Sequence, residues 1–200
     1  MNRIFLFAAA LFLILSSCSS STDVRRVDPS SQIDLSGYWN DVDVKIVCDA
    51  LVRDCLSSPR IEQAIRTKTA MPSVMVGRFR NESSEHIDTG IISSIMETAI
   101  FNSGRMNFVT GGSVRDEIRA ERQDQQIYAS EETMAKLRNE TGADFILTGA
   151  VRSIVDRDSN QTVRTYFVTA ELADIETNQR IWMGQNNEIK KVVTVPRNRF

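Results

Sequence analysis

The sequence contains few of the side chains that build metal and redox centres. One histidine and three cysteines occur in 200 residues. A zinc site requires clustered histidine, cysteine or carboxylate ligands, and the chain has neither a CxxC pair nor a histidine next to a thiol in the sequence. The composition therefore predicts no metal and no cofactor.

An excess of one charge sign is also missing. Lysine and arginine number 24, and aspartate and glutamate number 26, which leaves a net charge of -2. Nucleic-acid-binding proteins present a strongly basic face that neutralises phosphates. The charge balance therefore excludes a nucleic-acid partner and a polybasic membrane-binding patch.

The longest apolar run lies at the N-terminus and is too short to span a membrane. It covers twelve residues, Ile4 to Leu15, after the single base Arg3, whereas a spanning helix needs roughly 20. Such a run is typical of a cleaved export signal. It ends in Leu15-Ser-Ser-Cys18, which resembles the lipobox of bacterial lipoproteins and implies cleavage between Ser17 and Cys18 with a diacylglycerol on the Cys18 thiol. The alternative is an ordinary signal peptide with a chance cysteine.

The sequence divides into four predicted parts. They are a lipoprotein signal peptide (1–17), a lipidated cysteine with a short disordered tether (18–35), one globular α/β domain (36–195) and a C-terminal tail (196–200). The segment from Ser19 to Ser31 is polar and has no apolar period, as expected of a disordered tether. Fully stretched, the tether spans at most about 60 Å, so the domain is expected close to its membrane.

Apolar periodicity predicts helices in the first part of the domain and strands in the last part. The predicted helices are Asn40 to Leu56, Pro59 to Ile65, Ile87 to Ile100, Ser113 to Gln123 and Ser130 to Thr141. The predicted strands are Ser73 to Phe79, Met106 to Val109, Asp144 to Val155, Thr162 to Ile175 and Arg180 to Val192. The expected fold class is α/β, with a mixed, mainly antiparallel sheet of about five strands packed by helices.

Two cysteines inside the first predicted helix are expected to be free. Cys48 and Cys55 lie seven residues apart, about 10.5 Å along a helix axis, and a disulfide tolerates a Cα separation of only about 7 Å. Both are predicted to be small, inert core residues. Trp39 and Trp182 are likewise predicted to be core anchors.

The single histidine is predicted not to act as a catalytic base. His86 lies among Ser83, Ser84 and Glu85, which together could supply a nucleophile, a base and an orienting carboxylate. Neighbouring residues on a turn point in different directions, however, and the G-x-S-x-G nucleophile motif is absent. The chain is therefore predicted not to be an enzyme, with Ser83, Ser84 or Asp88 capping the next helix.

Several separated phrases of the sequence together resemble the LpoB family of lipoprotein activators of penicillin-binding proteins. The phrases are Asp34–Asp43, Val76–Thr89, Gly142–Gly149, Ala170–Asn178, Trp182 and Ile189–Lys191. The resemblance implies a domain similar to the TolB N-terminal domain. It also implies a class A penicillin-binding protein as partner, whose peptidoglycan synthesis the domain stimulates without a small-molecule substrate of its own.

The expected location is the outer membrane, with the lipid-anchored domain facing the periplasm. Ser19 directly after the cysteine is consistent with this location under enteric-type sorting, although an inner-membrane anchor would suit a tether shorter than the family's. The strand-to-helix corner of Arg78, Arg80, Asn81 and His86 is the predicted partner contact. The alternative function is a TolB- or CsgG-like envelope-binding or secretion-pore lipoprotein.

Overall fold

The structure is a computed structural model that describes residues 25–29, 31–135 and 140–195. The predicted cleavage and lipidation residues, Ser17 and Cys18, and the predicted tail 196–200 lie outside the described residues. The chain divides into two units, Met1–Ser31 and Gln32–Phe200. In the first unit, the amide and hydroxyl of Ser31 donate to the carbonyl of Asp28 over 2.9 and 2.6 Å.

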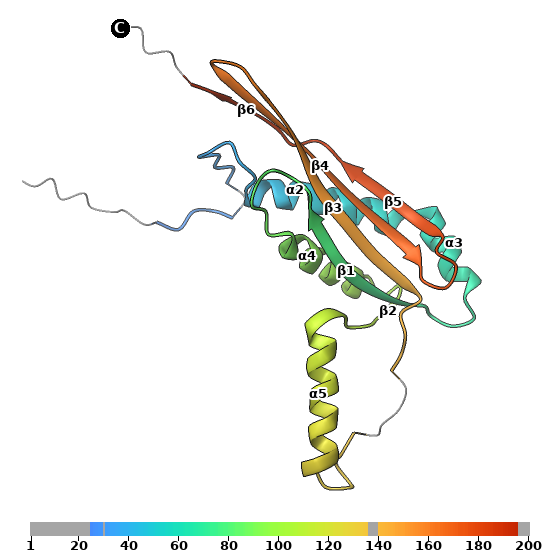
Figure 1. Ribbon diagram of the computed structural model, residues 1–200. Helices are drawn as coiled ribbons and strands as arrows, with labels where there is room; N and C mark the ends of the chain where they lie inside the picture. Colours follow the sequence, from blue (N-terminus) through green and yellow to red (C-terminus); the bar gives the residue numbers. More distant parts are fainter. Residues whose placement is uncertain (1–24, 30, 136–139, 196–200) are drawn as a thin grey trace, which may run out of the picture. The chain divides into compact units, whose positions relative to one another are not determined.

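The second unit contains a six-stranded mixed sheet and four helices in its described part (Figure 1). The helices are α2 (Asp41–Ser57), α3 (Pro59–Thr67), α4 (Thr89–Ser103) and α5 (Gly112–Tyr128). The strands are β1 (Ser73–Asn81), β2 (Asn107–Phe108), β3 (Phe145–Arg157), β4 (Gln161–Asp174), β5 (Arg180–Asn186) and β6 (Lys190–Thr194). The strand order is β2-β1-β3-β4-β5, and β6 also pairs with β4. Because β1 is parallel to β2 and β3 while the other pairs are antiparallel, the predicted fold class is confirmed.

Local capping explains where two of the helices begin and end. Asn40 and Asp43 form a reciprocal capping box at the start of α2, which satisfies two backbone amides that a helix leaves unpaired. Asp88 accepts from the amide of Gly90 at the start of α4, and Gly104 ends α4 in the left-handed region with φ 62°. Of the three predicted caps, Ser83, Ser84 and Asp88, the structure shows Asp88.

The core lies between the helices and one face of the sheet. Alternate residues of β4 are buried, from Tyr166 to Leu172, as its period of two requires. Helix α4 packs against β1, and both α2 and α3 pack against β5, so these three helices lie behind the sheet in Figure 1. No helix in the described part of the chain packs on the opposite face of the central strands.

The small core residues and the tryptophans lie largely as predicted. Cys48 and Cys55 are free and buried, and burial raises their pKa values to about 11 and about 12. Trp182 is 6% exposed and donates its indole N–H to Asp54 over 3.0 Å. Trp39 is only partly buried and packs against the core.

The strand predicted from Arg180 to Val192 is wrong as a single element. β5 ends at Asn186 and β6 begins at Lys190, and both pair with β4. Asn186 is opposite Val168 and Lys190 is opposite Thr165, so this stretch has one residue more than the facing stretch of β4. The extra residue interrupts the ladder as a β-bulge does.

The helix predicted from Ser130 to Thr141 is also wrong in its described parts. Residues 130–135 form one turn, in which the amides of Thr133 and Met134 donate to the Ser130 carbonyl over 3.0 and 2.9 Å. Residues 140–142 are not helical, and 136–139 lie outside the described residues. The segment has a good cap but few apolar residues to bury, so tertiary packing does not support a helix there. No helix in the described ranges is long and apolar enough to cross a membrane.

Candidate functional site

The sheet face that lies opposite α2, α3 and α4 is the candidate functional site, here called the open face. Strand register places its side chains in rows, because residues paired across strands share a face. Its residues are Arg80 on β1, Thr148, Ala150, Arg152 and Ile154 on β3, Thr165, Phe167, Thr169 and Glu171 on β4, and Met183 and Gln185 on β5.

The middle of the open face is a shallow depression. Its volume is about 230 Å³. Small side chains form the floor, and Ala150 is only 2% exposed although none of the described helices covers it. Longer side chains surround it, among them Arg80, Arg152, Glu171 and Met183. A depression bounded by long, mobile side chains can accommodate a protruding side chain of another protein.

Ion pairs lie on the open face and at its edge, and they contain three arginines and two glutamates. Glu82 binds two arginines, with Arg80 Nε at 3.0 Å and Arg152 Nη2 at 2.6 Å. Arg180 Nε lies 2.9 Å from Glu171 Oε2. All three arginine side chains are about half exposed or more, and exposed pairs contribute little to stability. These arginines can therefore exchange their present partners for carboxylates of a bound protein at little cost.

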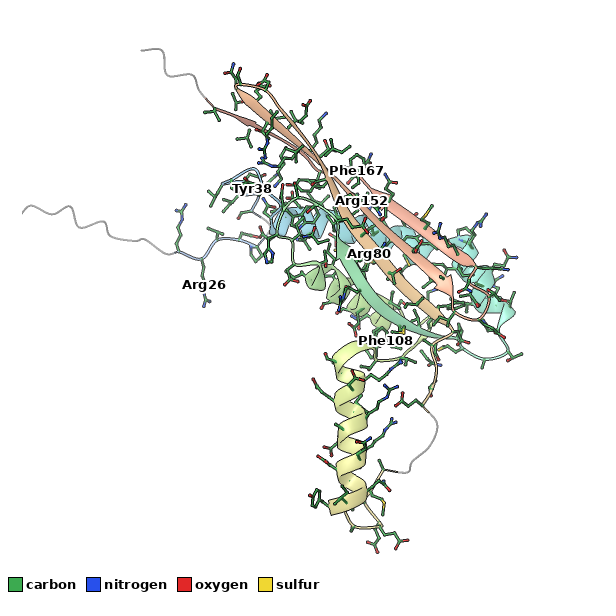
Figure 2. The ribbon with its side chains drawn as sticks, viewed as in Figure 1. Arg26, Tyr38, Arg80, Phe108, Arg152 and Phe167 are labelled. Atoms are coloured by element: carbon green, nitrogen blue, oxygen red, sulfur yellow. The ribbon has the colours of Figure 1, made fainter. Side chains whose placement is uncertain are left out.

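Apolar side chains lie beside these charges. Met183 is 64% exposed and Ile154 is 62% exposed. Phe167 is paired in register with Arg152, and Figure 2 shows Arg80, Arg152 and Phe167 on adjacent strands. Arginine, methionine and aromatic residues are enriched in protein–protein interfaces. The open face thus has the composition of a docking surface.

The four residues of the predicted corner do not form one surface cluster. Arg80 belongs to the open face, whereas Arg78 is exposed at a β-bulge of β1. The Asn81 amide holds the following turn, because its Nδ2 donates to the Glu85 carbonyl over 2.7 Å and its Oδ1 accepts from the Ser83 amide over 3.0 Å. His86 is exposed in that turn.

Ser83 and Glu85, which precede His86 in the sequence, are bonded to other residues. The Ser83 hydroxyl donates to Asn81 Oδ1 over 2.7 Å. The Glu85 carboxylate accepts from the Tyr166 hydroxyl over 2.8 Å and pairs with Arg164 at 3.3 Å. Within the described ranges, no group of three or more histidine, cysteine or acidic residues is arranged to hold a metal ion.

Sequence reasoning missed most of the open face. Arg152 and Phe167, for example, were not predicted as contact residues. The signal was present in the period of two along β4, whose buried residues alternate with partly exposed ones from Arg164 to Asp174. The alternation along β4 indicates that its apolar face packs on helices and that its other face is more polar. What could not be read from the sequence was which residues of β1, β3 and β5 share the polar face, because this depends on the pairing of the strands.

Several solved structures are similar to this chain. The chain is similar in structure to the C-terminal domain of LpoB from Escherichia coli, with 16% identity and a TM-score of 0.45 over 72% of this chain and 97% of that one. For the Salmonella enterica LpoB domain, the identity is 15% and the TM-score 0.42 over the same shares. Lipoprotein GNA1162 from Neisseria meningitidis matches with 16% identity and a TM-score of 0.36 over 64% of this chain and 87% of that one.

The sequence itself matches a family model. No curated protein sequence matches the chain significantly. The family model described as peptidoglycan-synthase activator LpoB matches residues 43–188, a range that runs from the first turn of α2 to the bulge between β5 and β6. This match does not favour the alternative of a TolB- or CsgG-like pore lipoprotein. The chain therefore belongs to the LpoB family of peptidoglycan-synthase activators.

Proposed function

We propose that this protein is a lipid-anchored activator that binds a class A penicillin-binding protein through the open face of its sheet. The observation that supports this function most strongly is the family match over residues 43–188. On this proposal, the domain has no catalytic chemistry of its own and changes the rate of an enzyme that it binds.

The open face is the surface best suited to such binding. The helix side of the sheet is filled by the core, whereas Arg152, Met183 and Ile154 are exposed on the other side. Interface energy is concentrated in a few aromatic, arginine and similar anchors near the centre of a contact. Arg152 and Phe167, paired across β3 and β4, are the proposed anchors, and Arg80 from the predicted corner extends the contact to β1. Arg78, Asn81 and His86 would lie at its margin.

Activation requires that the domain distinguish two states of the synthase. A ligand shifts a conformational equilibrium only by the difference in its affinity for the two states. The exposed ion pairs of Glu82 with Arg80 and Arg152 supply a means of discrimination, because these arginines gain new partners only when acidic groups of the synthase face them. We expect such groups to be positioned in the active state of the enzyme.

The proposed activator is held at the membrane by a lipid on Cys18. Cleavage between Ser17 and Cys18 and acylation of Cys18 would hold the domain at the outer membrane, facing the periplasm. Three acyl chains bind a bilayer far more strongly than one, since each buried methylene adds about 0.8 kcal/mol. The anchor restricts the domain to the compartment in which peptidoglycan is polymerised and cross-linked.

The test compares two charge reversals. Arg152→Glu changes the open face, and Arg53→Glu makes the same chemical change on an exposed position of α2 on the helix side. Each variant is added to the class A synthase of the same cell, and binding, glycan chain growth and cross-linking are measured. We expect Arg152→Glu to weaken binding and stimulation at least about tenfold, as for a central interface residue, and Arg53→Glu to match the unmodified protein.

Two outcomes would contradict the proposal in different ways. If the unmodified protein neither binds nor stimulates the synthase, the function is wrong. If it stimulates but Arg53→Glu impairs it more than Arg152→Glu, the activator function stands and the open face is the wrong surface. Detergent-stable oligomers without stimulation would instead indicate a pore-type lipoprotein.

A further inference from the structure

A short segment ahead of α2, Asp34–Tyr38, lies against β4 and β6 and is here called the strap. It has neither helical nor strand structure. Its first two residues, Asp34 and Leu35, are the last two of the predicted tether (18–35), so the tether leads directly into the strap. How firmly the strap is held therefore decides where the tether ends.

Lys191 on β6 holds the strap at two points. Its Nζ lies 2.5 Å from Asp34 Oδ1 and donates to the Tyr38 carbonyl over 2.9 Å. A third contact, 2.6 Å to Asp43 Oδ2, joins it to α2. Burial lowers the pKa of Lys191, but its bonds to Asp34 and Asp43 outweigh that effect and leave the pKa raised. The lysine is thus firmly charged.

Arg164 on β4 holds the strap between these points. Its guanidinium donates to the Gly37 carbonyl over 3.4 Å and lies 4.1 Å from the centroid of the Tyr38 ring. A separate contact of 3.3 Å joins it to Glu85. Gly37 fits closely against β6, because its φ is +68° and an added Cβ would meet Val193 Cγ2 at 2.2 Å.

Trp39 marks the fixed end of the strap. Its ring meets the Tyr166 ring edge to face at 5.2 Å. Its amide donates to Glu85 over 3.3 Å. The following residue, Asn40, caps α2. From Trp39 onward the chain is therefore tied to the core, whereas the strap before it is tied mainly by polar contacts.

Opening the strap would leave no buried charge without a partner. Lys191 would keep Asp43, and Arg164 would keep Glu85. A buried ion pair is costly to break when one charge remains uncompensated, and that cost does not arise here. The strap also buries little apolar surface, since Leu35 is 93% exposed and Tyr38 is 47% exposed. Segments with few buried apolar contacts open at low free energy.

We infer that the strap opens as a unit separately from the α/β body and so gives the tether two lengths. With the strap closed, the tether ends at Asp34. With the strap open, it ends at Trp39, and the five added residues extend its reach by roughly 17 Å. A tether as short as the one predicted here gains a substantial fraction of its span in this way.

Strap-side substitutions test the inference and leave the residues of the core unchanged. Gly37→Ala prevents closure by contact with Val193, and Asp34→Ala removes the bonds that Asp34 Oδ1 accepts from Lys191 and from the side chain of Asn40. A nitroxide on Leu35→Cys, in the full chain carrying Cys18→Ala, reports mobility by electron paramagnetic resonance. Cys48 and Cys55 are buried and stay unlabelled. The matched control is Lys190→Ala, since Lys190 is exposed next to Lys191.

The expected result is a change confined to the strap. Gly37→Ala and Asp34→Ala should shorten the rotational correlation time of the label at least about threefold, toward the ns motion of free loops, with the thermal unfolding midpoint unchanged. Lys190→Ala should change neither. The inference is overturned if the label is equally mobile in all variants, or if Gly37→Ala lowers the unfolding midpoint together with strap release. No synthase is needed, so this test is independent of the proposed function.

Discussion

Single side chains explain why this domain tolerates charges close to its core. Tyr166 is 1% exposed, yet its hydroxyl reaches Glu85 over 2.8 Å. Burial raises the pKa of Tyr166, and the hydrogen bond to Glu85 raises it further. Arg164, which is 5% exposed, neutralises Glu85. Tyr166, Glu85 and Arg164 therefore satisfy one another, as buried polar groups require.

The two buried cysteines lead to a prediction about thiol chemistry. Their pKa values are raised from 9.0 to about 11 for Cys48 and about 12 for Cys55 by burial. Only the thiolate reacts, so at pH 8 both should label with a thiol reagent at least about a hundredfold more slowly in the folded chain than in urea. Absorbance of the released reagent measures the rate.

The same shift predicts how stability depends on pH. Each thiol has a higher pKa in the folded than in the unfolded chain, so it favours the folded state while it is protonated. This contribution to stability is complete below about pH 9 and is lost as the pH rises through about 11 for Cys48 and about 12 for Cys55. Urea unfolding from pH 8 to 11 should therefore show a falling midpoint. The urea midpoint of a Cys55→Ala variant should fall less steeply over that range. Fast labelling of the folded chain at pH 8 would contradict the burial of the thiols.

Among the elements, α5 differs from the other helices because it has no buried residue. It is held by polar contacts to the segment that follows it. Arg119 binds Glu140 through two bonds of 2.8 and 3.0 Å, and Gln125 accepts from the amide of Ala135 over 2.9 Å. A polar helix of this kind depends on such pairs. Helix α5 should therefore be able to loosen without a change in the stability of the sheet.

Removing the carboxylate that α5 binds should loosen this helix alone. In Glu140→Gln, we expect trypsin to cleave after Arg119 or Arg122 at least about tenfold faster, while the urea midpoint of the sheet stays the same. Glu117→Gln, on the same helix, is the control. The bond to Arg119 lowers the pKa of Glu140 below its ordinary 4.5, so the contact is complete above pH 4.5 and is lost as the pH falls below it. Unchanged cleavage of Glu140→Gln would contradict this role.

At the scale of the whole molecule, the prediction concerns attachment to a membrane. The lipobox resemblance predicts that Cys18 carries the anchor, and the described chain contains no helix able to cross a membrane. Cys18→Ala should therefore move the protein from the membrane fraction to the soluble fraction after cell lysis, as measured by immunoblot. Ser20→Ala changes a neighbouring residue and keeps the predicted acylated thiol, so it serves as a control that should stay with the membrane. A Cys18→Ala protein that sediments with membranes would contradict the anchor.

Local sequence pattern was sufficient to predict most helices and strands of this protein. The α2 capping residue Asn40, the αL stop at Gly104 and the alternation along β4 are all short-range features. Backbone geometry and side-chain periodicity act over a few residues, so they can be read without knowledge of the fold. Helix geometry likewise predicted that Cys48 and Cys55 form no disulfide with each other.

Features that join distant segments required the folded chain. The break between β5 and β6 depends on pairing with β4, and the strap depends on the contacts of Asp34 with Lys191 and of Tyr38 with Arg164. The open face exists because three helices pack on the same side of the sheet. Such contacts depend on how elements far apart in the chain come together, and no local period encodes which residues will meet.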